Sequence, residues 1–346
     1  MARVAINGLG RIGRSTLKIL LDTPSLEVAA INDPSPVDGL VYLLKYDTVY
    51  GRYAKKVDTD GSHLIIDGKP YVVTSERDPL RLRWAEKGIE LVFECTGVFT
   101  GREDLRKHLQ AGAKTVILST TSKSEDIPTV VPGVNKPDPN DRIVSCASCT
   151  TNCITPVVEI VGRRIGMKKA IMTTVHAYTS TQRIVDEYSG KPRRGRAGAA
   201  NFVPTSTGAA VATTRVLPQY RGLFHGVGVR APNPCGSIAD IVMLTERRTT
   251  KDEVNSIFRE EAESPRYRGI FGATDDPVVS SDIIGDPRAS VVDLEMTQLV
   301  DGDLLKVMSW YDNEWGYSSQ MVRLALMMLP DTGKTRGEED ARKLGS

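Results

Sequence analysis

A candidate nucleophile, Cys149, stands in the run Ser148-Cys149-Thr150-Thr151-Asn152-Cys153. Ser148 is a good N-cap residue, and the threonines and the asparagine are common near the start of a helix. A thiol at a helix start lies near the positive end of the helix dipole, which stabilises the thiolate and lowers its pKa. The sequence therefore predicts a reactive cysteine at this position.

His176 is the candidate partner of that thiol, because it ends the apolar strand-like run Ile171–Val175. An imidazole at a strand end beside a thiol at a helix start would form a Cys/His pair, with the imidazole as base and charge partner. Residue types alone do not show that the two side chains meet, so the pair is a hypothesis. We interpret the other histidines as surface or structural residues: His63, His108 and His225.

A glycine motif, Gly8-Leu9-Gly10-Arg11-Ile12-Gly13, follows a strand-like run and opens a helix-like one, which is the context of a dinucleotide-binding turn. Gly8 permits the tight turn, Gly10 lets the backbone approach a pyrophosphate, and Gly13 lets the helix pack close to the sheet. The backbone N–H groups of Arg11 and Ile12 would then face the phosphates at the positive end of the helix.

Asp33 ends the second strand-like run, twenty positions after Gly13. An acid there accepts hydrogen bonds from the adenosine ribose and repels a 2′-phosphate, so NAD is the expected cofactor. The following Pro34-Ser35-Pro36 could reshape the pocket, which leaves the use of NADP open.

Three thiols crowd into the segment from Cys146 to Cys153, which has two other interpretations. No fourth Cys or His stands at a usual spacing for zinc, so we expect no metal. The Cys146-x-x-Cys149 spacing could be a redox pair, but its setting differs from a thioredoxin-like fold. Cys153 lies one helical turn after Cys149 and is either a core residue or a thiol that traps an oxidised Cys149.

The basic run Lys191–Arg196 has three interpretations: a small nucleic-acid patch, a solvated loop or an anion site. The last rests on the arginine side chain, whose fork suits phosphate oxygens. Thr207 and Gly208 follow this loop and could add a hydroxyl and a backbone N–H. Arg230 ends a strand-like run and is a second possible phosphate clamp.

The elements that must position these residues change character along the chain. In the first third, strand-like and helix-like runs alternate, which predicts a parallel sheet with helices on both faces. The strands are expected at Arg3–Asn7, Glu27–Asn32, Leu91–Cys95 and Thr115–Leu118, and the helices at Arg11–Leu21 and Arg102–Ala111.

After Ser145 the strand-like runs are longer and often alternate, which predicts an α+β domain with a mixed or mainly antiparallel sheet. We expect strands at Ala170–His176, Leu223–Arg230, Ile238–Thr245, Ser290–Leu294 and Leu304–Tyr311. Helices are expected at Thr151–Ile165, Ser206–Leu217, Lys251–Ala262 and Trp315–Leu329.

Composition limits the function classes. The 346 residues suggest about two domains, with 25% charged and 40% hydrophobic residues, as in ordinary globular proteins. The net charge of +2 argues against nucleic-acid binding as the main role. No apolar run is long enough to span a membrane and no secretory signal is visible. Five cysteines, an odd number, favour a reducing compartment, and we expect a cytoplasmic protein.

Taken in order, the motifs resemble the glyceraldehyde-3-phosphate dehydrogenase family from Val4 to about Leu329, with the Ser148–Cys153 run as the most specific one. The other motifs are Asn7–Arg14, Leu43–Asp47, Glu76–Pro79, His176–Thr179, Pro204–Ala210 and Trp310–Glu314. The resemblance implies a Rossmann-type parallel-sheet NAD-binding domain and an α+β catalytic domain. It also implies a homotetramer in which the Arg-rich loop packs near a neighbouring subunit's cofactor.

The resemblance implies phosphorylating oxidation of D-glyceraldehyde 3-phosphate. Cys149 would attack the aldehyde to form a thiohemiacetal, His176 would act as the base, and inorganic phosphate would cleave the resulting thioester. A thiolate suits both steps because it is nucleophile and leaving group. The backbone N–H of Cys149 would help to hold the developing oxyanion.

The resemblance also assigns the binding residues. Those implied to contact NAD are Gly8, Gly10, Arg11, Ile12, Gly13, Asp33, Arg77, Ser119 and Asn313. Those implied to hold the substrate phosphate are Thr179, Thr181 and Arg230. Those implied to line the site of the attacking phosphate are Ser148, Thr150, Arg194, Thr207 and Gly208. The implied domains are 1–148 for NAD, with 313–330 returning to it, and 149–312 for catalysis, followed by a charged tail at 331–346.

Several positions depart from the family pattern. Pro34-Ser35-Pro36 and Glu187-Tyr188 change the surroundings expected for the adenosine, where Glu187 would oppose a 2′-phosphate. Two alternatives within the same fold stay open: an erythrose-4-phosphate dehydrogenase and an NADP-accepting variant. A third alternative is an inactive relative that serves as a binding or scaffold protein.

Overall fold

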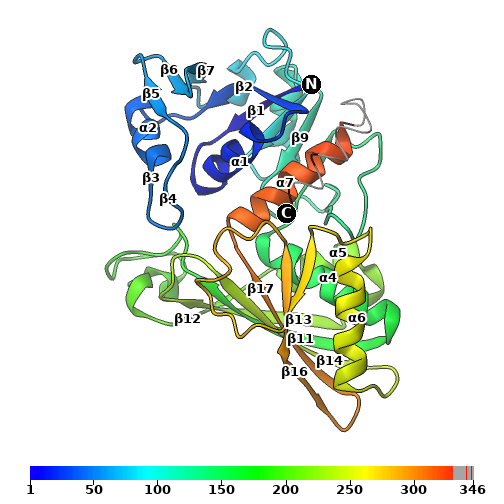
Figure 1. Cartoon of the computed structure of the whole chain (residues 1–346). Helices are drawn as coiled ribbons and strands as arrows, with labels where there is room; N and C mark the ends of the chain where they lie inside the picture. Colours follow the sequence, from blue (N-terminus) through cyan, green and yellow to red (C-terminus); the bar gives the residue numbers. More distant parts are fainter. Residues whose placement is uncertain (330–339, 341–343, 345–346) are drawn as a thin grey trace. The chain divides into compact units, whose positions relative to one another are not determined.

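The computed structural model describes residues 1–329, 340 and 344, and the chain divides into two compact units. One unit contains residues 1–130, 136–147 and, from 321 on, the end of the last helix; the other contains 131–135 and 148–320 (Figure 1). These units are defined by packing, so the functional domain boundaries expected from the sequence remain predictions. Most of the expected tail at 331–346 lies outside the described residues.

The first unit is built on a sheet with the strand order β10-β9-β8-β1-β2-β7-β6-β5. From β10 to β7 every neighbouring pair is parallel, and only β7-β6 and β6-β5 are antiparallel. The strands are β1 (Ala2–Asn7), β2 (Leu26–Asn32), β5 (Val57–Thr59), β6 (His63–Ile66), β7 (Lys69–Thr74), β8 (Leu91–Glu94), β9 (Thr115–Leu118) and β10 (Ile143–Ser145). The helices are α1 (Arg11–Leu21), α2 (Val37–Lys45), α3 (Arg102–Gln110) and the second half of α7 (Trp315–Met328).

The parallel strands of this unit are short and apolar because both of their faces are covered. Every residue of β8 is buried, as are five of the six residues of β1. The expected parallel sheet is therefore confirmed. The antiparallel edge β5–β7 and the small ribbon of β3 (Tyr46–Asp47) and β4 (Gly51–Arg52) are additions that the sequence analysis did not predict.

The carboxyl ends of the parallel strands lie in one row. Asn7 of β1 is paired with Asn32 of β2 on one side and with Glu94 of β8 on the other. Glu94 is paired with Leu118 of β9, which is paired with Ser145 of β10. The loops that follow this row are where ligands bind in open parallel sheets.

The second unit contains a seven-stranded sheet of order β12-β13-β11-β14-β17-β16-β15, in which only β11-β13 and β15-β16 are parallel. A mainly antiparallel sheet is thus confirmed. The strands are β11 (Met167–Ala177), β12 (Val203–Ser206), β13 (Phe224–Ala231), β14 (Ser237–Thr245), β15 (Phe271–Thr274), β16 (Ser290–Val300) and β17 (Leu304–Tyr311). The helices are α4 (Cys149–Arg164), α5 (Ala209–Val216) and α6 (Lys251–Glu263).

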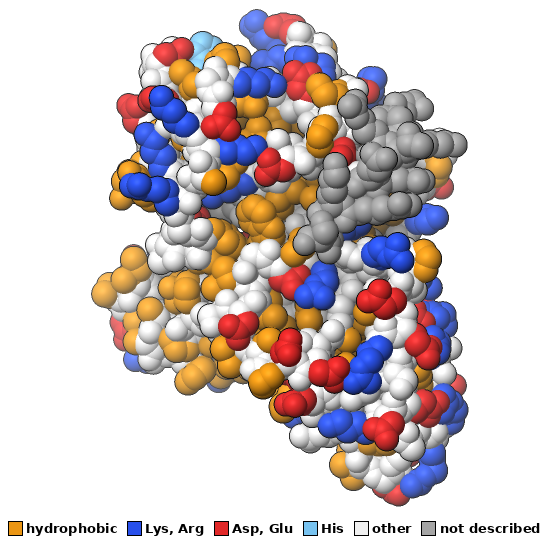
Figure 2. Space-filling view, in the orientation of Figure 1, with side chains coloured by type: hydrophobic (Ala, Val, Ile, Leu, Met, Phe, Trp, Pro, Cys, Tyr) orange, Lys and Arg blue, Asp and Glu red, His pale blue; other side chains and the backbone are white. Residues whose placement is uncertain are grey.

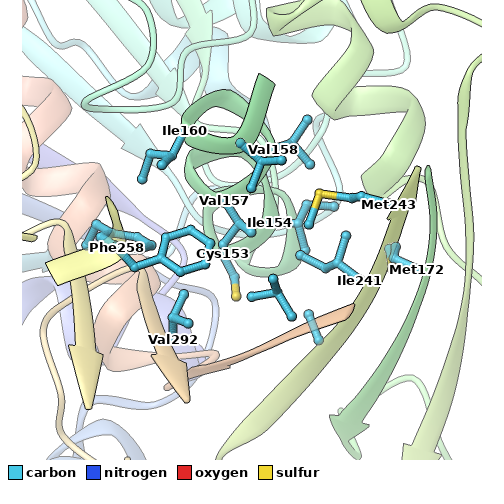
Figure 3. Close-up of a cluster of buried hydrophobic side chains, with 14 of the residues drawn as sticks. Cys153, Ile154, Val157, Val158, Ile160, Met172, Ile241, Met243, Phe258 and Val292 are labelled. Atoms are coloured by element: carbon cyan, nitrogen blue, oxygen red, sulfur yellow. The ribbon is translucent and has the colours of Figure 1, made fainter. Parts of the chain in front are cut away.

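The core of this unit lies between the helices and one face of the sheet. Figure 3 shows Cys153, Ile154 and Val157 of α4 beside Ile241 and Met243 of β14. Each of these side chains is fully buried. Because side chains alternate across a strand, the residues between them point to the other face of the sheet. That face leaves Ile171, Val175 and Val227 exposed.

Two helix starts differ from the expected ones. Helix α5 begins at Ala209 instead of Ser206, because Val203–Ser206 pairs with β13 as an edge strand. Helix α4 begins at Cys149, two residues before the expected Thr151, because Ser148 caps it. The Ser148 hydroxyl accepts a hydrogen bond from the Thr151 N–H at 3.1 Å.

Candidate active site

The first unit contains a cavity of about 470 Å³ at the carboxyl ends of its parallel strands. Its lining includes four of the residues expected to contact NAD: Gly8, Gly10, Asp33 and Arg77. The other five do not line it: Arg11, Ile12, Gly13, Ser119 and Asn313. The cavity has the position and the acidic residue expected of a dinucleotide pocket.

The three glycines of the motif fit this role for different reasons. Gly8 has a φ of +92°, and a Cβ there would lie 2.8 Å from the Thr96 backbone nitrogen. A Cβ on Gly13 would lie 2.0 Å from the Gly8 carbonyl oxygen, so this glycine allows helix α1 to start against the loop. A Cβ on Gly10 would meet nothing within 4 Å, and Gly10 lines the cavity. Gly10 therefore leaves room for a ligand.

Asp33 is a buried carboxylate that holds the glycine loop. One of its oxygens accepts from the Leu9 N–H at 2.7 Å and the other from the Ser35 N–H at 2.8 Å. Each carboxylate oxygen can accept more than one hydrogen bond, so the side chain retains capacity for a ribose hydroxyl. The residues present fit the adenosine end of NAD.

The Arg11 side chain has a structural role in the described contacts. Its guanidinium donates to Asp47 at 2.6 Å and lies over the Tyr50 ring. The expected contact of Arg11 with NAD was through its backbone, and that contact remains a prediction. Asn313, also expected to contact NAD, belongs to the second unit, where its side-chain oxygen accepts from the Ser237 hydroxyl at 2.9 Å.

Several residues that line the cavity had no role assigned to them from the sequence. Three of them, Asn7, Asn32 and Thr96, lie at or just after strand ends of the first unit. Polar residues at the carboxyl ends of predicted parallel strands were the available signal. Glu76, Cys95 and Phe99 also line the cavity.

In the second unit the structure brings the candidate nucleophile and its partner together. Cys149 is the first residue of helix α4, and its Sγ lies 3.3 Å from Nε2 of His176. His176 lies near the end of β11 and is buried, on the side of the sheet that faces the helices. Twenty-seven positions separate the two residues in sequence.

The second ring nitrogen of His176 lies in a fixed environment. Nδ1 is 2.7 Å from the Ala177 carbonyl oxygen, which can only accept a hydrogen bond. Arg230, the register partner of His176 on β13, donates to Ala177 O at 3.0 Å and also contacts Nδ1. Ala177 O can only accept and the guanidinium can only donate, so these two neighbours favour opposite tautomers of His176. In the tautomer that donates from Nδ1 to Ala177 O, the lone pair of Nε2 is directed at the Cys149 thiol.

The charges of this pair differ from the expectation. Burial raises the pKa of the Cys149 thiol, and the Arg230 charge opposes that rise. Burial, with the Arg230 charge as a second cause, lowers the pKa of His176 to about 3. The expectation of a lowered thiol pKa from the helix start is therefore wrong for this state, because desolvation outweighs the helix dipole. A neutral thiol faces a neutral imidazole that can take its proton.

Tyr311 is a residue of this site to which the sequence analysis gave no role. Its buried hydroxyl lies 2.9 Å from the Thr150 hydroxyl and 2.8 Å from the Thr174 hydroxyl. Its ring meets the His176 ring edge-on, with 5.9 Å between centroids. Tyr311 thus joins the first turn of α4 to strand β11, from which the thiol and the imidazole project.

The residues expected to bind phosphate form a hydroxyl and guanidinium cluster. The Thr179 and Thr181 hydroxyls lie 2.8 Å apart, and Arg194 Nη1 reaches the Thr181 hydroxyl at 3.5 Å. Arg194 Nε donates to the Thr205 hydroxyl at 3.0 Å. Hydroxyls and a guanidinium in one cluster suit an oxyanion.

The remaining expected phosphate residues lie at helix starts. The Thr207 hydroxyl accepts from the Ala209 N–H at 3.3 Å, and Gly208 is the N-cap of α5. Ser148 and Thr150 are at the start of α4, where their hydroxyls bond to Thr151 and Tyr311.

The structure also bears on the hypotheses for the basic loop, for Cys153, for a metal site and for a membrane helix. In the basic loop Lys191–Arg196, Arg196 pairs with Asp186 at 2.6 Å, and Arg194 belongs to the threonine cluster. Cys153 is fully buried, with its sulfur 3.9 Å from the Ser290 hydroxyl. Among the described residues, no three His, Cys, Asp or Glu side chains are grouped to hold a metal ion. Within the same part of the chain, no helix has the length and apolarity needed to cross a membrane.

A dinucleotide pocket on a parallel sheet, together with a Cys/His pair between a helix start and a strand of the second unit, is the arrangement expected of an NAD-dependent dehydrogenase. Two family models match the chain: the NAD-binding domain of glyceraldehyde 3-phosphate dehydrogenase over residues 2–102, and its C-terminal domain over 148–313. The chain belongs to the glyceraldehyde-3-phosphate dehydrogenase family.

Full-length relatives agree with the family models. The chain is 46% identical to a glyceraldehyde-3-phosphate dehydrogenase of Thermotoga maritima, over 95% of this chain and 99% of the relative. It is 45% identical to that of Geobacillus stearothermophilus, with 93% and 97% covered, and 44% identical to that of Zymomonas mobilis, with 94% and 98% covered. The expected family and the cofactor NAD are thereby confirmed.

Proposed function

We propose that the protein catalyses the NAD-dependent, phosphorylating oxidation of D-glyceraldehyde 3-phosphate to 1,3-bisphosphoglycerate. The observation that carries this proposal is the contact of 3.3 Å between Cys149 Sγ and His176 Nε2. The names of the relatives support the choice of substrate. The reaction would belong to glycolysis or gluconeogenesis.

In the first step, His176 takes the thiol proton on Nε2 as Cys149 Sγ bonds to the aldehyde carbon, which gives a thiohemiacetal. The Arg230 charge favours this step, because it opposes the rise that burial causes in the pKa of the thiol and so stabilises the thiolate that attacks. The backbone N–H of Cys149, at the positive end of helix α4, would stabilise the oxyanion.

Bound NAD supplies the acceptor for the hydride that leaves the thiohemiacetal carbon. The residues that would hold it include Gly8, Gly10, Asp33 and Arg77 of the cavity in the first unit. Loss of the hydride leaves a thioester on Cys149, and attack by inorganic phosphate then releases the acyl phosphate and the thiolate. His176 returns a proton to that sulfur.

The threonine and arginine cluster supports the phosphate chemistry. Thr179 and Thr181, with Arg230, would hold the phosphate of the substrate. Arg194, with groups at the starts of α4 and α5, would hold the attacking phosphate. Arg230 has a second effect, because its charge favours a neutral His176 and opposes the rise in the thiol pKa.

The test is a set of initial rates with NAD or NADP, with glyceraldehyde 3-phosphate or erythrose 4-phosphate, and with or without inorganic phosphate. We expect the highest kcat/KM with NAD, glyceraldehyde 3-phosphate and phosphate together. A higher value for erythrose 4-phosphate, or turnover that does not need phosphate, would contradict the proposal. Equal efficiency with NADP would contradict the role of Asp33.

The scaffold alternative is tested by thiol labelling. An active enzyme requires Cys149 to react with iodoacetamide faster than the buried Cys153 and faster than Cys149 in a His176→Gln variant. A thiol that is inert in both proteins would favour the scaffold.

The same proposal includes a homotetramer working in the cytoplasm. Large apolar side chains of the second unit are exposed, including Ile184 at 90%, Tyr188 at 88% and Phe202 at 70%. Figure 2 shows apolar side chains gathered over the part of this unit where β12 and the preceding loop lie. Patches of this kind mark protein–protein contacts. Light scattering, which measures the mass of the particle in solution, tests the tetramer. The five free cysteines support a reducing compartment such as the cytoplasm.

A further inference from the structure

A row of buried polar side chains lies beneath the cofactor cavity, within the first unit. Its members are Trp84, His108, Glu94, Asn7 and Asn32, and none of them is more than 3% exposed. His108 projects from helix α3 and Glu94 is the last residue of β8. The reaction chemistry described above uses none of these side chains.

The direction of each hydrogen bond in this row follows from the chemistry of the groups. The Trp84 indole N–H can only donate, and it reaches Nδ1 of His108 at 3.1 Å. Nδ1 must therefore carry a lone pair, so the proton of the neutral ring is on Nε2. That N–H donates to Oε2 of Glu94 at 3.0 Å.

The Glu94 carboxylate receives three further donors. The Asn7 side-chain amide donates to Oε2 at 2.6 Å. The Thr96 backbone N–H donates to Oε1 at 2.8 Å, and the Thr96 hydroxyl donates to the same oxygen. Each Glu94 oxygen therefore has two hydrogen-bond partners, and none of the four is a Lys or Arg side chain.

A fully buried acidic side chain without a Lys or Arg partner is costly to desolvate, and apolar residues of similar volume would fill the same space at lower cost. Such groups are concentrated at functional sites. The position of Glu94 agrees with this, because two of its partners, Asn7 and Thr96, line the cofactor cavity.

The orientation set by Glu94 continues to the far side of the cavity. With its amide nitrogen on Glu94, Asn7 presents its oxygen to the Asn32 amide at 2.7 Å. Asn32 in turn donates to the Glu76 carbonyl at 2.8 Å and accepts from the Glu76 N–H at 2.9 Å. Glu76 and the adjacent Arg77 line the cavity. Glu94 therefore sets which way the amide groups of Asn7 and Asn32 point, at the ends of β1 and β2.

We propose that Glu94 is a positioning residue for cofactor binding, which orients Asn7 and Thr96 at the floor of the NAD pocket. The proposal rests on the NAD binding of the family, and it does not depend on the aldehyde substrate or on the phosphorylating step.

The test replaces Glu94 and measures NAD affinity by titration calorimetry, without aldehyde or phosphate. In Glu94→Gln, one carboxylate oxygen becomes an NH₂ group that faces two donors. Asn7 or Thr96 must then reorient, and we expect the Kd for NAD to rise about tenfold or more. Glu94→Asp keeps the charge but retracts it by one methylene, so we expect a loss of affinity of at least about threefold.

Trp84→Phe is the matched control, because it removes a buried hydrogen bond of the same row at a side chain that bonds to His108 and does not line the cavity. We expect it to lower the melting temperature while the Kd for NAD stays within twofold. The proposal is overturned if Glu94→Gln binds NAD within twofold of the parent. It is also overturned if Trp84→Phe loses as much affinity as Glu94→Gln at an equal loss of stability. Should the Gln variant not fold, the Asp variant decides: unchanged affinity overturns the proposal, and a loss greater than that of Trp84→Phe supports it.

Discussion

The cofactor pocket and the thiol site differ in how far apart in the sequence their residues lie and in which groups they present. The pocket is lined by two glycines of the short motif Gly8–Gly13 and by residues at the ends of parallel strands and in the loops that follow them. The thiol site consists of side chains from α4, β11, β13 and β17, which span residues from Cys149 to Tyr311. The first depends on where a side chain is absent, and the second on which side chains are brought together.

A substitution should therefore have a different effect at each site. In the pocket, an added methyl group should change binding through volume alone. In the thiol site, exchange of one atom should change the chemistry while the fold persists. The predictions below test this separation.

The largest effect is expected for Cys149→Ser. An alcohol is a poorer nucleophile and leaving group than a thiol, and we expect kcat to fall by at least about 10⁴-fold. Affinity for NAD should stay within twofold, because the pocket residues of the first unit are unchanged. Steady-state rates and calorimetry check the two values. Acyl phosphate production at the parent rate would contradict the assignment of the nucleophile.

The next effect concerns two glycines of one motif. Gly13→Ala would place a Cβ 2.0 Å from the Gly8 carbonyl oxygen, so we expect a loss of stability of about 1–3 kcal/mol together with weaker NAD binding. Gly10→Ala meets no protein atom within 4 Å and should leave stability unchanged. Denaturant titration separates the variants.

The Gly10→Ala variant also tests where the cofactor lies. If the pyrophosphate lies against this backbone, the added methyl group should raise the Kd for NAD by roughly tenfold or more. Unchanged affinity would mean that the space beside Gly10 is not used by the cofactor.

The pocket could be predicted from the sequence more fully than the thiol site. The strand–glycine turn–helix of the pocket is contained in consecutive residues, so β1, α1 and Asp33 could be placed from local rules. Sequence could propose Cys149 and His176 separately, by their positions at a helix start and a strand end. Their contact depends on strand order and register, which local patterns do not determine.

The electrostatic state of the thiol was mispredicted for a related reason. The helix start at Cys149 is a local feature and was foreseen, whereas burial depends on the packing of distant strands. Tyr311 illustrates the same limit, because its role arises from contacts with Thr150 and Thr174, more than 130 positions away along the chain.

A moderate effect is expected in the pH dependence of stability. The pKa of His176 is lowered from 6.5 to about 3, so between these values the unfolded chain binds a proton that the folded chain does not. Stability should therefore fall as the pH decreases from 6.5 toward 3, with a contribution of up to about 1.4 kcal/mol per pH unit from this one group. His176→Gln should lack that contribution. Denaturant titrations of both proteins at pH 6.5 and 4.5 measure it, and equal slopes would contradict the burial of a neutral imidazole.

The smallest effect is expected for Tyr311→Phe, which removes one hydroxyl and keeps the ring against His176. Thr150 and Thr174 each lose a buried partner, so we expect a loss of stability of about 1–2 kcal/mol. If Tyr311 only supports the fold, kcat should be unchanged once the variant is folded. If it also fixes the first turn of α4 relative to β11, kcat should fall by several-fold while the KM for NAD stays constant. That split would show that precision in the thiol site depends on distant side chains, in contrast to the local glycine motif of the pocket.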